Sequence, residues 1–310
     1  MKPLVARIGF CLFCFLLVLT VLGCGRTPDD VEIVPEANLA PVAAEEIPEE
    51  IVTPVPSETA VVTETPVLSA PTEVEVLSAP AEVQVLSIQI LERRPHNSDA
   101  FTQGFEFFEG RLFESRGLYG ESGVSEINPS NGELMRWLPL GNQFFGEGLT
   151  VVGDTLIQLT WRNGVANVID IDSFVIVDVF NFEGEGWGLC FAGDVLYMSD
   201  GSSRLTIRDP ESFLIVDEMT ITRDGVPVTE INELECVGED IYANVWKTND
   251  ILVIDRSSGN VRAVVDASGL LTVEESESAD ALNGIAYLEE SDTFLITGKF
   301  WPAMFEVTFE

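Results

Sequence analysis

Short apolar runs, separated by polar turns, fill the chain from residue 88 to its C-terminus. In one stretch, an apolar run over 148–152 is followed by the turn Gly153-Asp154 and a second apolar run over 156–161. A Gly-Asp pair between two β-rich runs is a hairpin signal. A second hairpin, with a turn such as 209–213, follows in most stretches. Two hairpins in about 45 residues predict a four-stranded sheet.

One residue pattern recurs in each stretch: a polar or aromatic residue, then Gly, then an apolar residue. Its five copies start 44, 40, 45 and 51 residues apart, and the fourth copy has Glu in place of Gly. A period of about 40–50 residues built from short strands is typical of propeller blades. We therefore predict an all-β fold, a five-bladed β-propeller, in which the first residues of the copies occupy equivalent places around a ring. These residues form a set suited to a binding site: Gln103, Glu147, Trp187, Asn232 and Asn283.

Residues 1–24 have the composition of a lipoprotein-type signal peptide. Lys2 and Arg7 precede an apolar stretch over 8–22, which is short for a membrane span of roughly 20 residues. The stretch ends in a small residue followed by Cys24, as in a bacterial lipobox. We expect lipidation at Cys24 and an exported protein that is lipid-anchored in the bacterial cell envelope, facing the periplasm or the outer surface. The alternatives are an ordinary signal peptide and an uncleaved anchor.

Residues 25–87 differ in composition from the rest of the chain. They are rich in Pro, Glu, Val, Ala and Thr and contain a nine-residue repeat at 67–75 and 76–84. Frequent Pro prevents a helix or a central strand from propagating, and like charges extend the chain. We expect a disordered acidic Pro-rich linker here and a folded domain over 88–310. The net charge of −36 and the lack of a basic stripe argue against a nucleic-acid partner.

Two cysteines, Cys190 and Cys236, and one histidine, His96, lie in the expected folded domain. An exported protein could join the cysteines in a disulfide. However, Cys190 lies two residues after the Gly position of its copy, and Cys236 lies three residues after the equivalent Glu233. Because side chains alternate between the two faces of a strand, these cysteines should point to opposite faces, and we expect buried free thiols. One histidine cannot build a His-ligated zinc site, so we expect no catalytic metal and assign His96 to structuring a loop. A structural calcium ion in the central channel is left open.

An ordered series of ten motifs gives the chain a family resemblance. The series runs 99–104, 114–120, 145–148, 159–161, 186–189, 199–201, 232–235, 243–246, 282–286 and 297–302. It closely resembles the plant- and bacterial-type glutaminyl-peptide cyclotransferases, which are five-bladed propellers. The resemblance implies a transferase, an acyltransferase of the aminoacyl type, that converts the N-terminal glutamine of peptides and proteins to pyroglutamate and releases ammonia. We expect a monomer that requires no cofactor for catalysis.

The resemblance also implies a site at one mouth of the central channel. We expect Glu147 to shuttle a proton from the substrate amine to the leaving group, Asn232 to hold the substrate amide, and Lys299 to stabilise the oxyanion or fix the substrate backbone. Substrate-binding residues complete the expected site: Phe101, Gln103, Phe145, Trp161, Trp187, Trp246 and Asn283.

Each of these residues also has a structural interpretation. The tryptophans could pack between blades, Glu147 could be a solvated strand end, and Lys299 could be a surface cation. For the domain as a whole, two alternative functions are kept. One is a non-catalytic, surface-tethered binding module, and the other is a calcium-dependent, lactonase-like propeller.

Overall fold

The computed structural model describes residues 82–310, which form β-strands and one short helix, so the all-β prediction is confirmed. The helix α1 (Val273–Ser276) is a single turn, and within residues 82–310 no helix is long and apolar enough to cross a membrane. The expected signal peptide at 1–24, the lipidation site Cys24 and most of the expected linker lie outside the described residues. Strand β1 begins at Gln84, inside the range 25–87 that we assigned to the linker.

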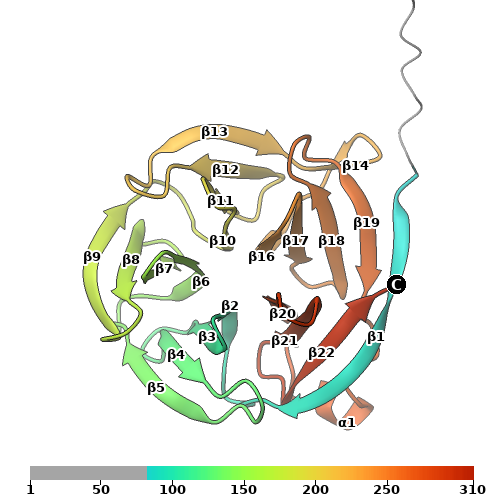
Figure 1. Cartoon of the computed structure of the whole chain (residues 1–310), viewed down its shortest axis with the longest axis horizontal. Helices are drawn as coiled ribbons and strands as arrows, with labels where there is room; N and C mark the ends of the chain where they lie inside the picture. The colour runs from blue at the N-terminus through green and yellow to red at the C-terminus, as the bar shows by residue number, and fades with distance from the viewer. Residues whose placement is uncertain (1–81) are drawn as a thin grey trace, which may run out of the picture. The chain divides into compact units, whose positions relative to one another are not determined.

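Most strands belong to four sheets with inner strands near a common axis and outer strands at the rim (Figure 1). Three sheets have four strands each: β2 (Thr102–Phe108), β3 (Arg111–Arg116), β4 (Gly123–Ile127) and β5 (Leu134–Pro139); β6 (Gly146–Val152), β7 (Thr155–Thr160), β8 (Val165–Asp170) and β9 (Val175–Asn181); β10 (Leu189–Phe191), β11 (Leu196–Met198), β12 (Arg204–Arg208) and β13 (Ile215–Thr220). A hairpin of β14 (Thr222–Arg223) and β15 (Val226–Pro227) follows.

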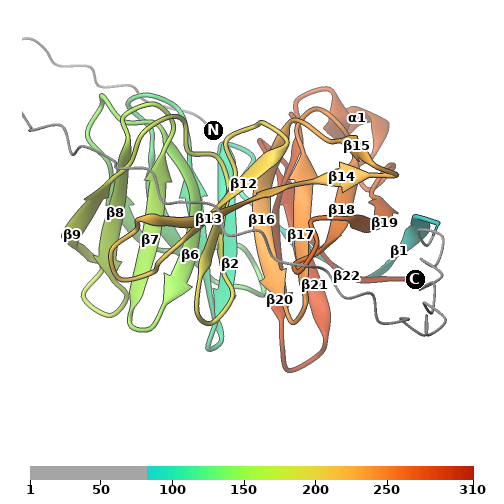
Figure 2. The ribbon, with the colours of Figure 1, turned by 90° about the horizontal axis from the view of Figure 1, so that it is seen from above.

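The fourth sheet has eight strands, in the order β16-β17-β18-β19-β1-β22-β21-β20. Its members are β16 (Ile231–Val237), β17 (Asp240–Val245), β18 (Asp250–Asp255), β19 (Val261–Asp266), β1 (Gln84–Pro95), β22 (Ala303–Phe309), β21 (Thr293–Gly298) and β20 (Leu282–Leu288). Turned by 90° (Figure 2), inner strands such as β2, β6 and β16 run along the axis, and α1 lies at one end.

Strand β1 joins the two ends of the folded region. Its first part, 84–87, pairs in parallel with 263–266 of β19, and the remainder pairs antiparallel with β22. The first strand of the domain therefore lies between two of the last strands. Ring closure depends on main-chain hydrogen bonds between segments that are far apart in the sequence.

The core lies between the faces of neighbouring sheets. Phe113 and Val124 of one sheet pack against Leu149, Leu156 and Ile169 of the next, and all five are almost completely buried. These residues come from the alternating apolar positions of the strands, which is the pattern that buries both faces of a sheet inside a stack. Apolar burial of this kind is the main favourable contribution to the stability of the ring.

The recurring glycine of the sequence pattern is required by close approach between neighbouring inner strands. A Cβ atom at Gly188 would lie 2.0 Å from the backbone oxygen of Asn232, and one at Gly148 would lie 2.6 Å from the backbone oxygen of Trp187. The fourth copy has Glu233 in place of this glycine, and its side chain reaches the strands β2 and β20. There it accepts hydrogen bonds from the backbone N–H groups of Phe105 and Ile285.

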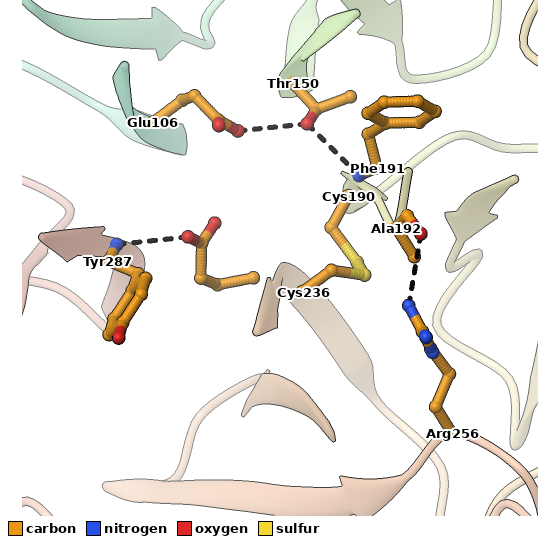
Figure 3. Close-up of a disulfide and its surroundings, with 9 residues drawn as sticks. Glu106, Thr150, Cys190, Phe191, Ala192, Cys236, Arg256 and Tyr287 are labelled. Carbon is orange, nitrogen blue, oxygen red and sulfur yellow. Dashed lines mark hydrogen bonds between the residues drawn. A yellow bond between two sulfur atoms is a disulfide. The ribbon is translucent and has the colours of Figure 1, made fainter. Parts of the chain in front are cut away.

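Cys190 and Cys236 form a disulfide, so the expectation of two free thiols is wrong. Figure 3 shows the bond between β10 and β16, the inner strands of adjoining sheets. The Cα atoms are 5.5 Å apart, an ordinary spacing for a disulfide. Side chains do alternate between the two faces along each strand, but neighbouring sheets pack face to face. Residues on opposite faces of equivalent strands therefore point toward each other across the gap between two sheets.

Candidate active site

The antiparallel hairpins bring two separate sets of residues to one end of the inner strands. Gly146 at the start of β6 pairs with Thr160 at the end of β7, and Ile231 of β16 pairs with Val245 of β17 in the same way. A residue at the start of an inner strand therefore lies near the residue that follows the second strand. This is why Glu147 lies at the same end as Trp161.

A cavity of about 290 Å³ lies at this end of the ring, and nine of the ten predicted site residues line it. They are Phe101, Gln103, Phe145, Glu147, Trp161, Trp187, Asn232, Trp246 and Lys299. A larger hollow of about 510 Å³, lined by residues of β1, β19 and β22 among others, contains none of the predicted residues. We take the smaller cavity as the candidate active site because its lining combines aromatic walls with converging polar groups.

The walls of the cavity are aromatic rings in contact with one another. The Phe145 ring centroid lies 6.0 Å from that of Phe101 and 5.5 Å from that of Trp161. On the other side, Trp187 and Trp246 meet edge to face at 5.6 Å. Such rings remove water from the interior, so the charged groups among them lose solvation.

Glu147 and Lys299 are the buried charged pair of the cavity, each with only 4 % of its surface exposed. Burial raises the pKa of Glu147 well above its ordinary value, while the Lys299 charge and a hydrogen bond with the Gln103 side chain act in the opposite direction. Burial likewise lowers the pKa of Lys299, and the charges of Glu147 and Asp280 oppose that shift. The shift of Glu147 is toward neutral pH, and a carboxyl group whose pKa lies near the working pH can accept and return a proton.

Asn232 lines the cavity and carries a polar atom without a partner in the described part of the chain. Its side chain is buried, and its Oδ1 has no hydrogen-bond partner among residues 82–310. A buried acceptor without a partner costs free energy, and a substrate N–H group would satisfy it. The backbone of Asn232 is fixed in turn, because its carbonyl oxygen accepts a hydrogen bond of 2.7 Å from the Ser199 hydroxyl.

Asn283, the tenth predicted residue, lies behind the cavity wall and does not line it. It is fully buried, and its Nδ2 donates to the backbone oxygen of Thr102 at 3.0 Å and to Oε1 of Gln103 at 3.4 Å. It thereby orients the Gln103 amide, whose side chain in turn interacts with Glu147.

Sequence reasoning missed Leu118, Lys247 and Asp280, which also line the cavity. Lys247 follows Trp246 directly, and its Nζ lies 4.0 Å from the centroid of that ring. Lys247 and Lys299 are the two lysines of residues 82–310, and both lie at this cavity. The available sequence signal was a rare lysine directly after a motif tryptophan in a strongly acidic chain.

His96 does not line the cavity, and its ring contacts two segments near it. One ring nitrogen lies 2.9 Å from the Trp301 carbonyl oxygen and the other lies 2.9 Å from Oε1 of Glu114. Thr102, the neighbour of Gln103, donates a hydrogen bond of 2.7 Å to the same Glu114 oxygen. The position agrees with the expected role in structuring a loop, namely the turn that follows Lys299.

Comparisons with known proteins show the family of this chain. The glutamine cyclotransferase family matches the chain over residues 60–309. A glutaminyl-peptide cyclotransferase of Arabidopsis thaliana is 33 % identical over 225 residues, which cover 71 % of this chain and 70 % of the plant protein. The crystal structure of Myxococcus xanthus glutaminyl cyclase matches with a TM-score of 0.68 and 36 % identity, over 74 % of this chain and 99 % of that one. The chain therefore belongs to the glutamine cyclotransferase family.

Proposed function

We propose that this protein is a glutaminyl-peptide cyclotransferase that acts on peptides and proteins with an N-terminal glutamine. The observation that carries the proposal is that Glu147 and Lys299 are buried together in one aromatic cavity, in a chain of this family. As an enzyme it would be an acyltransferase of the aminoacyl type. The γ-acyl group of the glutamine passes from its amide nitrogen to the α-amine of the same residue.

Glu147 is the proposed proton shuttle. The α-amine nitrogen attacks the side-chain amide carbon, which forms the ring C–N bond, and the proton of the amine passes to the Glu147 carboxylate. The bond from that carbon to the amide nitrogen then breaks, and Glu147 returns the proton to the leaving nitrogen, which departs as ammonia. One carboxyl group within reach of both nitrogens suffices, and its raised pKa suits both steps.

The other cavity residues bind and orient the substrate. The Asn232 amide, with its free Oδ1, accepts from the side-chain N–H₂ of the glutamine. Lys299 donates to the oxygen that becomes negative during attack, in an environment where such a contact is strong because water is excluded. Phe101, Phe145 and the tryptophans press the glutamine side chain into the bent form that the reaction requires.

We further propose that the architecture is a five-bladed β-propeller in which the eight-stranded sheet contains two blades, β16–β19 and β20–β22 with β1. The sheet order and the arrangement of inner strands around one axis (Figure 1) support it. Nuclear magnetic resonance of backbone amides, with cross-strand contacts assigned for β1, β19 and β22, tests the division. A chain in which β1 pairs with neither neighbour would contradict it.

From the sequence we also propose a monomer that is exported and held in the bacterial cell envelope by lipid on Cys24, with no cofactor needed for catalysis. Light scattering tests the oligomeric state, and mass spectrometry of the N-terminal peptide tests the lipid. A structural cation in the channel also stays a proposal. Among residues 82–310, no group of three or more His, Cys, Asp or Glu side chains is arranged to hold a metal ion.

The decisive experiment measures ammonia release from Gln-Ala and Gln-Phe peptides, with and without a chelator. Glu147→Gln should lower kcat by at least about 100-fold while circular dichroism and thermal unfolding stay close to those of the parent. Glu290→Gln, which changes an exposed glutamate in the same way, is the matched control and should leave the rate unchanged. Near-parental ammonia release by the Glu147 variant would exclude Glu147 as the shuttle, and chelator-sensitive ester hydrolysis without ammonia release would favour the lactonase alternative.

A further inference from the structure

We propose that Glu185, which lies just behind the cavity wall, is a positioning residue that holds two tryptophan walls together and places a fixed negative charge beside Glu147. The inference rests on the proposed cyclotransferase function. It assigns a role to a residue that is absent from the predicted site and from the cavity lining.

The geometry of Glu185 joins two sheets through one carboxylate. The residue lies between β9 and β10, and its Oε2 accepts hydrogen bonds from the indole N–H of Trp161 at 2.7 Å and from that of Trp187 at 3.1 Å. Trp161 follows β7, whereas Trp187 precedes β10, so the two indoles come from different sheets. An indole has one N–H donor, and both donors converge on a single oxygen.

The second carboxylate oxygen is held as well. Oε1 accepts a hydrogen bond of 2.8 Å from Nε of Arg162, and the guanidinium of Arg162 lies 3.8 Å from the Trp161 ring centroid. The side chains of Arg162 and Glu185 are 59 % and 34 % exposed, so the ion pair itself adds little stability. What it contributes is orientation. Trp161 is fixed by the hydrogen bond of its N–H, by the cation on its face and by contact with the tilted Phe145 ring.

The charge of Glu185 acts on Glu147. Lys299 and Gln103 favour the ionised form of Glu147, and Glu185 opposes them by raising the pKa of Glu147. Asp280 and Lys247 are the other charged side chains that line the cavity. Although burial raises the pKa of Glu185 itself, hydrogen bonds from Trp187, Arg162 and Trp161 outweigh burial and hold it below its ordinary value.

The two carboxyl groups therefore have separate duties. Glu185 stays ionised over the pH range in which Glu147 titrates, because the pKa of the first is lowered and that of the second is raised. Its oxygens are engaged by donors of the wall and take no part in proton transfer. Two neighbouring carboxyl groups with pKa values pushed apart by their surroundings are the usual arrangement for such a division.

The test is the pH profile of kcat/KM for ammonia release from a Gln-Ala peptide. Glu185→Gln keeps an oxygen that can accept from the indoles but removes the charge. We expect the acid limb of its profile, which follows ionisation of Glu147, to move to lower pH by several tenths of a unit or more. Glu185→Ala removes the acceptor as well, and kcat/KM should fall by about 10- to 100-fold because the walls lose their alignment.

Glu183→Gln is the matched control. It removes a negative charge two residues away on the same segment, from an exposed side chain, and should leave the profile in place. A residue that merely stabilised the fold would change thermal unfolding without moving the acid limb. If the acid limb of Glu185→Gln coincides with that of the parent, the inference is wrong. If the parent releases no ammonia from any N-terminal glutamine peptide, the proposed function has failed instead.

Discussion

Breaking the Cys190–Cys236 disulfide should remove a large part of the stability of the domain. The bond closes a loop with a sequence separation of 46 residues. In the chain-entropy description, closing a loop of this length in the unfolded chain removes about 13 cal/mol/K, which corresponds to about 4 kcal/mol at 25 °C. Measured disulfides often contribute less than this description predicts, so we expect a loss of about 2–4 kcal/mol in the free energy of unfolding.

The assay compares guanidinium unfolding of the oxidised protein, of the same protein kept reduced, and of the double variant Cys190→Ala/Cys236→Ala. The reduced protein isolates the effect of the cross-link, because all side-chain carbon and sulfur atoms are retained. The variant adds the loss of packing at Cys190, which is almost fully buried. We expect a lower midpoint with a similar or larger slope, since the unfolded chain without a cross-link exposes more surface.

Peptide mapping shows whether the bond exists in solution. Without reductant, trypsin should yield the fragments 163–204 and 224–247 as one cross-linked species, which separates on reduction. If the fragments separate without reductant, the disulfide assignment is wrong. If they are linked but reduction changes the free energy of unfolding by less than about 0.5 kcal/mol, the loop-entropy reasoning is refuted.

Two further predictions concern buried charges. Burial raises the pKa of Glu106 to about 7, with hydrogen bonds from Thr150 and the Val151 backbone opposing it; between about pH 4.5 and 7 the folded state binds more protons than the unfolded state, so stability falls as the pH rises, by up to roughly 3 kcal/mol. Glu106→Gln should reduce this slope, and the neighbouring Glu233 and Glu235, whose pKa values are also raised by burial, should keep their own part of it. The slope is measured by urea unfolding at pH 4 and pH 8, and equal differences from the parent at both values would contradict the prediction. Lys299→Gln removes the cation that favours ionised Glu147, so in addition to lowering kcat it should move the acid limb of the rate profile to higher pH. A limb that moves to lower pH would contradict the proposed pairing.

Much of the fold and most of the site could be predicted from the sequence because the repeat marks the same place in each sheet. The first residues of the copies lie at one end of the inner strands, and the hairpin turns bring Trp161, Trp246 and Lys299 to that end. Family resemblance supplied these last three. The position of Asn283 in the repeat does not predict that its side chain binds Gln103 instead of lining the cavity. That outcome depends on the direction of the side chain at the buried start of the strand.

The parts that sequence reasoning missed depend on contacts between sheets. The disulfide forms across a gap between two sheets, so alternation along a single strand pointed to the wrong conclusion. Glu185 lies in a connecting segment that carries no apolar period, and its importance comes from two indoles brought to it by separate sheets. Contacts between side chains of different sheets depend on how the sheets pack, and the local residue pattern of one segment does not determine them.

The position of β1 also sets the order of events during synthesis and folding. Its pairing segments are made before any other strand, yet its partners β19 and β22 are among the last. The early part of the chain must therefore wait, with one strand unpaired, until the C-terminal residues are released. Pairing over such long separations is slow to form and leaves open strand edges exposed meanwhile. Loss of the final strand β22 would remove the antiparallel partner of β1, so the ring could not close and strand edges would stay exposed.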